Sequence, residues 1–370
     1  VPHLRFPEFS GEWKKCIIQD YGEVITGNTP PTNNAEYYNN GSYLWASPAD
    51  LGTGKKINDT KTKLSESGFK KTRIIPKGSI LVTCIGSTIG KIGMAVETMS
   101  SNQQINSIIV NEKSNNDFVY YAISRAFPRY LSEVGVQAVP ILSKSNFEKL
   151  PNYTTSIEEQ DKTGYFLNLL DERIATQNKI IDKLQSLIKG ISNKIFATIQ
   201  GIEYRMGNIV TISNGNSNVQ DAVTESKDGL YPFFDRSEDI KYLPTFLFDK
   251  EAIIYPGEGA EFMPRYFRGK FALHQRCYAI FDFKEIINAQ FLYFYLKTQN
   301  SYFVRNAVGS TVPSLRLDTF QKLKVIIPPK KIQHSVSLCL SSMEQKCNVE
   351  KDILQKLLKQ KQYLLRQMFI

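Results

Sequence analysis

The stretch VPILSKSNFEKLP at residues 139–151 returns as VPSLRLDTFQKLK at residues 312–324. A single offset of 173 residues, 312 minus 139, aligns the two copies without a gap as far as residues 196 and 369. The identical pairs in this alignment include Pro140 with Pro313, Phe147 with Phe320, Leu150 with Leu323, Gln160 with Gln333, Leu184 with Leu357 and Phe196 with Phe369. A repeat of this length predicts two similar halves that end in the same kind of segment.

The final segment of each copy has heptad spacing, because apolar residues recur at alternating intervals of three and four. The first copy places at these positions Leu167, Leu170, Ile174, Gln177, Ile181, Leu184, Ile188, Ile191 and Ile195. The second copy places there Leu340, Met343, Cys347, Glu350, Leu354, Leu357, Lys361, Leu364 and Met368. About forty helical residues at about 1.5 Å each predict a rod of roughly 60 Å.

Two polar residues, Gln177 and Glu350, interrupt this seam at equivalent positions. A single polar residue in a seam can fix the register of a coiled coil at some cost in stability. The alternative is that each position simply tolerates a polar side chain. The pattern leaves both interpretations open.

The chain has 370 residues, a net charge of +10 and a pI near 9.1. This length can bury two ordinary cores, and the repeat favours two globular units with two helices over one large domain. An excess of basic residues points to nucleic acid, to an anionic membrane or simply to solubility. We favour nucleic acid as the partner.

The five cysteines are scattered and odd in number, which argues against a disulfide framework and against a zinc ribbon. Residues 1–9 lack the apolar core of a signal peptide, and no stretch approaches eighteen uninterrupted apolar residues. We therefore expect no membrane association and a reducing, cytoplasmic setting.

Each half begins with short strand patterns, turn residues and one helical stretch, which predicts a compact α+β unit. The predicted elements are strands at 79–85 and 105–110 with a helix at 117–134, then strands at 252–255 and 277–281 with a helix at 289–308. Each helix runs into a glycine, Gly135 or Gly309, and then into a connector that contains proline.

These patterns predict two globular domains that each lead into a long helix. The expected bounds are 1–155 and 201–329 for the domains and 156–200 and 330–370 for the helices. The two domains align less well than the helices, and the alignment needs shifts that place Tyr43 opposite Tyr231 and Gln104 opposite Gln275. A duplicated scaffold with different surfaces suits two recognition domains that have different specificities.

The sequence gives little support to catalysis. The three histidines lie far apart, and the chain has neither a His-Glu-x-x-His motif nor a cysteine and histidine cluster, so we expect no metal centre. Residues 86–92 are one residue too short for a phosphate loop, and Ile92 stands where Ser or Thr is required. Residues 28–31 lack the aromatic residue of an amino-methyltransferase motif, and Asp221, Glu225 and Lys227 are too tightly spaced for a nuclease site.

Several short strings, taken in order, resemble the specificity subunits of type I restriction-modification systems. They are LRFPEF at 4–9, GEW at 11–13, GNTP at 27–30, WASPADL at 45–51, GSTIGK at 86–91, NQQ at 102–104, LP at 150–151 and IEEQ at 157–160. Each string is short, but their order and the internal repeat together span the whole chain. The second copy departs from the first, since KKIQ at 330–333 keeps only the glutamine and the GSTIGK string has no counterpart.

The resemblance implies a non-catalytic subunit whose two target-recognition domains each read half of a bipartite, asymmetric DNA site. Its two long helices would pair as an antiparallel coiled coil that acts as spacer and docking platform. The implied partners are double-stranded DNA, two methyltransferase subunits and, in the full complex, restriction subunits. The chain itself would need no cofactor, because S-adenosylmethionine belongs to the methyltransferase partner, and ATP with Mg to the restriction partner.

Contacts of Lys and Arg with phosphates would supply affinity, and bidentate side chains would read the bases. The candidates in the first domain are Ser47, Asp50, Lys55, Lys56, Lys61, Lys63, Lys70, Lys71, Thr88, Lys91, Gln103 and Gln104. Those in the second are Arg236, Ser237, Arg265, Arg268, His274, Gln275 and Arg276, with Arg236 the foremost candidate for a base contact. The alternatives are an ordinary solvated surface and, for Gln104 and Gln275, a scaffold role shared by both domains.

Two similar units related by a pseudo-two-fold axis would make one chain imitate a symmetric dimer. Dimeric readers contact half-sites about 34 Å apart, so the length of the helices would set the gap in the DNA site. Two other functions share the basic charge and the repeat. One is a stand-alone DNA-binding regulator or scaffold, and the other is a fused restriction-modification enzyme, against which the missing catalytic motifs argue.

Overall fold

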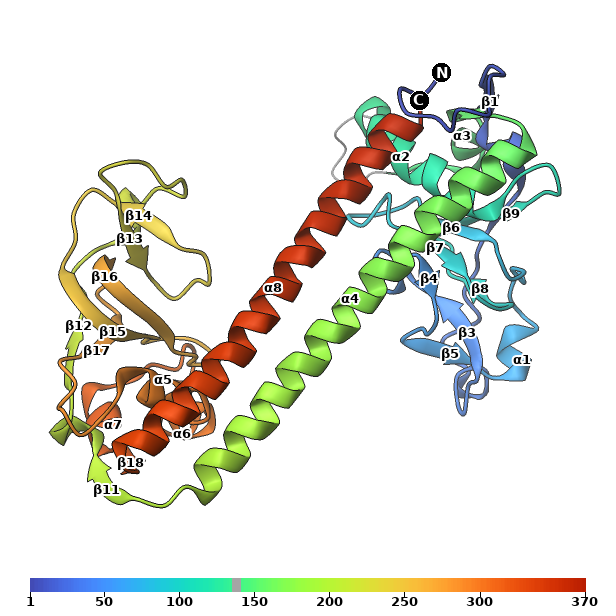
Figure 1. Ribbon diagram of the computed structural model, residues 1–370. Coiled ribbons are helices and arrows are strands. Elements are labelled where there is room, and N and C mark those ends of the chain that lie inside the picture. Colours follow the sequence, from blue (N-terminus) through green and yellow to red (C-terminus); the bar gives the residue numbers. More distant parts are fainter. Residues whose placement is uncertain (135–140) are drawn as a thin grey trace. The chain divides into compact units, whose positions relative to one another are not determined.

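Two long helices, α4 (Ile157–Thr198) and α8 (Lys330–Met368), end the two copies of the repeat. The chain divides into unit 1, Val1–Asn178 with Ile353–Ile370, and unit 2, Lys179–Asp352 (Figure 1). Unit 1 therefore holds the start of α4 and the end of α8, and unit 2 holds the end of α4 and the start of α8. Within each unit the two helix segments run antiparallel, as predicted.

The computed structural model describes residues 1–134 and 141–370 of the chain. Gly135 and Pro140 of the first connector lie outside the described residues.

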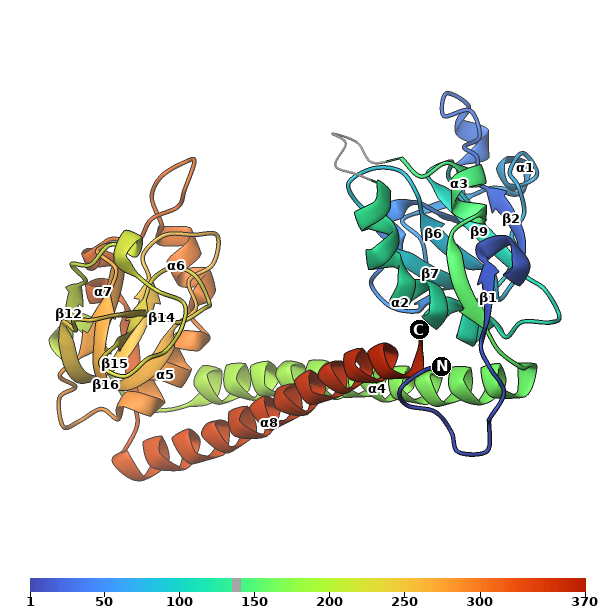
Figure 2. The same ribbon diagram turned by 90° about the horizontal axis from the view of Figure 1, so that it is seen from above.

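Unit 1 contains a five-stranded sheet in the order β2-β9-β6-β7-β4, a three-stranded sheet β5-β3-β8 and a two-stranded sheet β1-β10. The strands are β1 (Lys14–Ile17), β2 (Gly22–Thr26), β3 (Tyr43–Ala46), β4 (Lys56–Ile57), β5 (Thr62–Leu64), β6 (Ile80–Thr83), β7 (Ile92–Ala95), β8 (Ser100–Ser101), β9 (Ile105–Val110) and β10 (Pro151–Thr154). The other helices of this unit are α1 (Glu66–Phe69), α2 (Asn116–Val134) and α3 (Lys144–Glu148). Helix α2 packs on β6 and β7 of the larger sheet (Figure 2).

Unit 2 contains a six-stranded sheet in the order β12-β17-β15-β16-β13-β14 and a two-stranded sheet β11-β18. The strands are β11 (Ile202–Arg205), β12 (Thr211–Asn214), β13 (Tyr231–Phe234), β14 (Lys241–Leu243), β15 (Phe248–Pro256), β16 (Arg265–Leu273), β17 (Cys277–Phe281) and β18 (Lys324–Ile327). The helices are α5 (Ala289–Lys297), α6 (Asn300–Asn306) and α7 (Leu317–Lys322). Helix α5 packs on β15 and β16 (Figure 2).

One predicted element of unit 2 differs from the structure. The helix expected at 289–308 is two helices, α5 and α6, with a break at Thr298 and Gln299. The Thr298 hydroxyl donates a hydrogen bond of 2.7 Å to the carbonyl of Tyr295, which satisfies a main-chain acceptor at the end of α5. Phe303 of α6 lies in the core, where it is fully buried against Tyr255.

An aromatic residue at the C-terminal end of each long helix lies in the core of a unit, Phe196 inside α4 and Phe369 directly after α8. In unit 1 the ring of Phe369 lies 5.2 Å from that of Phe118. In unit 2 the ring of Phe196 lies 5.4 Å from that of Phe291. Both pairs follow the sequence repeat, so each core is completed by the helix that begins in the other copy.

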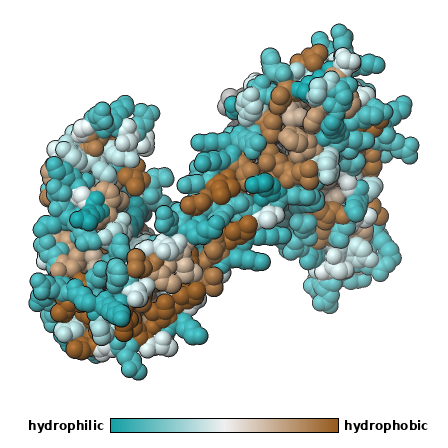
Figure 3. All heavy atoms as spheres, viewed as in Figure 1, coloured by the Kyte–Doolittle hydropathy of each residue, from teal (hydrophilic) through white to brown (hydrophobic). Residues whose placement is uncertain are grey.

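The heptad positions of both helices are buried or half-buried throughout. Other apolar side chains on these helices face solvent, and they include Tyr165, Phe166 and Leu169 on α4 and Leu338 and Tyr363 on α8. Figure 3 shows apolar surface along both helices. Tyr165 and Leu338 are equivalent in the repeat, so each copy carries an exposed apolar residue at the same place.

Candidate nucleic-acid interface

In each unit two parallel strands end side by side at one edge of a sheet. In unit 2, β13 pairs with β16 in the register Phe234 to Leu273. In unit 1, β3 pairs with β8 in the register Ala46 to Ser101. Because the carboxyl ends of parallel strands share an edge, the residues that follow these strands lie next to each other. Most of the predicted base-reading residues stand in these segments.

The turn after the second strand has three residues in both units, and its hydrogen bonds are the same. The main-chain N–H of the first turn residue donates to a carbonyl at the end of the neighbouring strand. In unit 1 Asn102 donates to Ala46, and in unit 2 His274 donates to Phe234, at 2.9 Å in each case. The side chain of that residue accepts the N–H of the third, at 3.0 Å for Gln104 and 3.2 Å for Arg276. The two turns are therefore one structure with different side chains.

This register corrects the sequence alignment by one residue. The structural counterpart of Gln275 is Gln103, and that of Gln104 is Arg276. The error arose because Gln275 could be aligned equally well with Gln103 or with Gln104. Only the strand pairing distinguishes the two alignments. Gln103 and Gln275 are both exposed at the middle of the turn.

In unit 2 the turn borders a cleft of about 290 Å³. Four predicted residues line it, namely Arg236, His274, Gln275 and Arg276, and the other lining residues are Val219, Asp235, Glu258 and Cys277. The Arg276 guanidinium donates a hydrogen bond of 2.7 Å from Nη1 to Glu258 Oε1. The arginine side chain is 63% exposed and the glutamate 17%.

Two acidic residues of this cleft were missed by the sequence analysis. Asp235 is buried and accepts hydrogen bonds from Lys241 Nζ at 2.6 Å and from the Ser237 N–H at 2.8 Å. Burial opposes its ionisation, but these donors outweigh burial and hold the pKa of Asp235 below its ordinary value. Glu258 stands between two glycines, Gly257 and Gly259. This glycine pair was the one feature of the sequence that could have drawn attention to Glu258.

The surroundings of His274 favour its neutral form. Burial lowers its pKa, Arg276 and Arg236 lower it further, and the carboxylates of Asp235 and Glu258 offset only part of this effect. The Nδ1 atom accepts the N–H of Arg276, so the ring proton of the neutral imidazole is on Nε2.

The other candidates of unit 2 lie on β13 and β16 and their loops. The Ser237 hydroxyl donates to Asp235, and Arg265 donates to the Ser237 carbonyl, so these two residues support the loop that carries Arg236. Arg268 is exposed on β16, where it faces Glu251 of β15 across the ladder.

In unit 1 the equivalent edge carries Ser47 and Asp50. Asp50 accepts hydrogen bonds from the Ser47 N–H at 2.8 Å and from the Lys61 N–H at 2.9 Å, so it closes the loop after β3. Thr88 and Lys91 lie in the loop between β6 and β7, and the lysine is exposed.

Comparison with known proteins agrees with this architecture. The sequence profile described as "Type I restriction modification DNA specificity domain" matches residues 10–186 and again residues 202–359. The chain belongs to this family of type I restriction-modification specificity subunits.

Relatives and solved structures of other specificity subunits give the extent of the likeness. The MjaIX specificity subunit of Methanocaldococcus jannaschii is 25% identical over 93% of this chain and 89% of its own length. The HindI specificity subunit of Haemophilus influenzae is 32% identical over 48% of this chain and 40% of its own. The crystal structure of an S subunit from M. genitalium covers 100% of this chain and 99% of its own, with a TM-score of 0.68 at 18% identity, and so supports the fold.

The family relationship makes the chain a DNA-specificity subunit and not an enzyme. Among the described residues, no group of three or more His, Cys, Asp and Glu side chains could hold a metal ion. Over the same two ranges of the chain, no helix has the length and hydrophobicity needed to cross a membrane.

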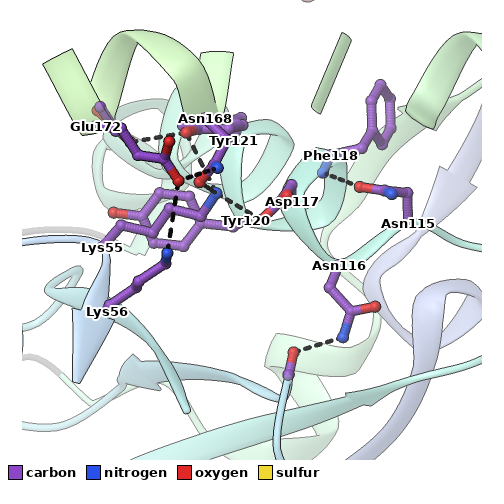
Figure 4. Close-up of polar contacts among 12 residues, drawn as sticks. Lys55, Lys56, Asn115, Asn116, Asp117, Phe118, Tyr120, Tyr121, Asn168 and Glu172 are labelled. Carbon is purple, nitrogen blue, oxygen red and sulfur yellow. Dashed lines mark hydrogen bonds and ion pairs between the residues drawn. The ribbon is translucent and has the colours of Figure 1, made fainter. Parts of the chain in front are cut away.

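One predicted phosphate contact of the specificity subunit needs correction. Lys55 is buried, with its side chain 4% exposed, and Nζ lies 2.5 Å from Asp117 Oδ1 and 3.0 Å from Asn168 Oδ1 (Figure 4). Burial lowers the pKa of Lys55, and Asp117 opposes this shift. An ammonium group enclosed in this way ties the residue before β4 to α2 and α4 and is not available to a DNA phosphate. The neighbouring Lys56 is exposed, and its Nζ atom lies 3.8 Å from Glu172 Oε1.

Proposed function

We propose that this specificity subunit reads a bipartite, asymmetric DNA site, with one half-site for each globular domain, residues 1–155 and 201–329. The observation that carries the proposal is that the two units share one turn geometry and carry different side chains on it. Asn102, Gln103 and Gln104 in unit 1 correspond to His274, Gln275 and Arg276 in unit 2. An identical scaffold with different hydrogen-bonding groups is what two readers of different base sequences require.

The bases would be read by side chains at the shared sheet edge, and the phosphates by exposed lysines. For base contacts we propose Ser47, Thr88, Gln103, Gln104, Arg236, His274, Gln275 and Arg276. For phosphate contacts we propose Lys56, Lys61, Lys63, Lys70, Lys71, Lys91 and Arg268. Asp50, Ser237 and Arg265 would hold the reading loops in shape. The net charge of +10 suits a polyanionic partner.

We propose further that the long helices bind two methyltransferase subunits, which use S-adenosylmethionine, and that ATP- and Mg-dependent restriction subunits join in the full complex. The equivalent exposed residues Tyr165 and Leu338 support two similar docking surfaces, one from each copy of the repeat. A solved chain of similar fold, with a TM-score of 0.57 at 14% identity, comes from a study of complex assembly in a type I system. We place the complex in the cytoplasm.

The test is adenine methylation mapped across a genome by single-molecule sequencing, with this chain co-expressed with a cognate methyltransferase subunit. The control is that methyltransferase subunit alone. We expect a split motif with a fixed gap that appears only when both chains are present. If expressed and assembled subunits give the same methylation with and without this chain, a stand-alone DNA-binding regulator or scaffold becomes the better explanation.

A further inference from the structure

The third residue of the reading turn is the position at which the two domains differ most in chemistry. In unit 2 it is Arg276, and in unit 1 it is Gln104. The residue that faces it also corresponds between the units, since Glu258 bridges to Ser314 and Ile85 bridges to Ile141. Both bridges follow the same offset of the repeat, so the two local structures can be compared residue by residue.

In unit 2 this position holds an oriented arginine. Glu258 is mostly buried and its carboxylate holds Nη1 of Arg276, while the guanidinium remains largely exposed to the cleft. A bidentate fork that is held by a carboxylate on one side loses less side-chain entropy on binding than a free one. Within the described chain the only hydrogen bond of this side chain is the one to Glu258, so Nε and Nη2 can donate to a ligand.

In unit 1 the same position holds an amide without a carboxylate. Gln104 Oε1 accepts from Asn102 Nδ2 at 3.1 Å, and Nε2 lies 3.4 Å from the Ile85 carbonyl. The backbone is common to both units, so the difference in chemistry comes from two substitutions, at the turn and at the residue facing it.

We propose that Arg276, oriented by Glu258, reads a guanine in the half-site of the second domain, and that Glu258 is a specificity-determining residue of this subunit. An arginine fork donates to the N7 and O6 atoms of guanine, whereas an amide such as that of Gln104 matches adenine. The proposal rests on the proposed function, because it assigns a base to a site that must first bind DNA.

The experiment uses the complex of this chain with its cognate methyltransferase subunit. The methylated motif of the wild-type complex supplies the DNA duplex, and each guanine of the motif is replaced in turn by 7-deazaguanine, which lacks the N7 acceptor. We expect one such replacement, in one half-site, to weaken binding about tenfold. In the R276A complex the same replacement should have no further effect.

The E258Q variant tests the role of the carboxylate with little change of shape. We expect it to relax the base preference of the methylome at that one position and to leave the other half-site unchanged. D282N is the matched control, because Asp282 forms an exposed ion pair with Lys250 elsewhere in the same domain and should leave the motif intact.

The outcomes separate the two proposals. A wild-type complex that yields no split motif contradicts the proposed function itself. A split motif with no 7-deazaguanine-sensitive guanine, or a penalty that persists in R276A, overturns the assignment of Arg276. If the R276A complex fails to assemble, the E258Q variant provides the test. An unchanged base preference in E258Q overturns the role of Glu258.

Discussion

Gln160 and Gln333 make the same two hydrogen bonds in the two units. The main-chain N–H of Asn115 donates to Gln160 Oε1 at 3.0 Å, and that of Asn288 donates to Gln333 Oε1 at 2.7 Å. Each Nε2 donates at 2.8 Å to the carbonyl five residues earlier. Both glutamines are 1% exposed, so they join the start of a long helix to the start of the globular helix α2 or α5.

Replacing Gln160 by alanine should destabilise unit 1 by about 1–3 kcal/mol, because the N–H of Asn115 is left without its acceptor in a partly buried place. We expect faster hydrogen exchange at the start of α2 and no change in α5. Q333A should give the reverse pattern. Q360A, at an exposed position of α8, is the control, and equal effects of Q160A on both units would contradict the prediction.

The adjacent residues Lys55 and Lys56 should separate stability from DNA binding. K55M should cost about 1–3 kcal/mol of folding free energy, since it leaves Asp117 without its buried partner. It should leave the salt dependence of DNA affinity unchanged. K56M should do the opposite, with nearly unchanged stability and a log–log salt slope smaller by about 0.9.

The measurement is DNA affinity of the complex with methyltransferase between about 50 and 200 mM salt, together with thermal unfolding of each variant. A reduced salt slope in K55M would show that this ammonium group does reach a phosphate.

Glu159 should make unit 1 sensitive to acid. Burial raises the pKa of this carboxyl, but hydrogen bonds from Arg5, Thr155 and Trp13 outweigh burial and hold the pKa below its ordinary value of 4.5. Because the folded-state pKa is the lower one, the stabilisation is present above the ordinary value and is lost as the pH falls through the folded pKa.

We therefore expect the stability difference between wild type and E159Q to be constant above pH of about 5 and to shrink below it. Urea unfolding at a series of pH values measures this difference. A gap that stays the same down to the acid unfolding of both proteins would exclude Glu159 as the group responsible.

Phe369 should anchor the end of α8 in unit 1. F369A should cost about 3 kcal/mol, because it empties a buried site between Trp13 and Phe118. Hydrogen exchange should increase in α2 and in the last turns of α8. Y363A, which truncates a side chain that is 60% exposed, should change the stability of the isolated chain by less than about 0.5 kcal/mol.

The amino-acid sequence was sufficient for the repeat and for the two long helices, whereas the shared sheet edge appeared only in the strand pairing. The repeat and the helices depend on local periodicity and on a constant offset, both of which can be read along the chain. The break between α5 and α6 could not be read in this way, since it depends on where Phe303 finds space in the core.

What only the tertiary structure decided is which polar side chains face the cleft and which are enclosed. Glu258 and Arg276 meet because Pro256 and Cys277 pair between β15 and β17. Lys55 is buried because α2 brings Asp117 to it, from more than sixty positions along the chain. Sequence patterns show the properties of each residue. Contacts between residues this far apart in the chain form only when the strands and helices have packed.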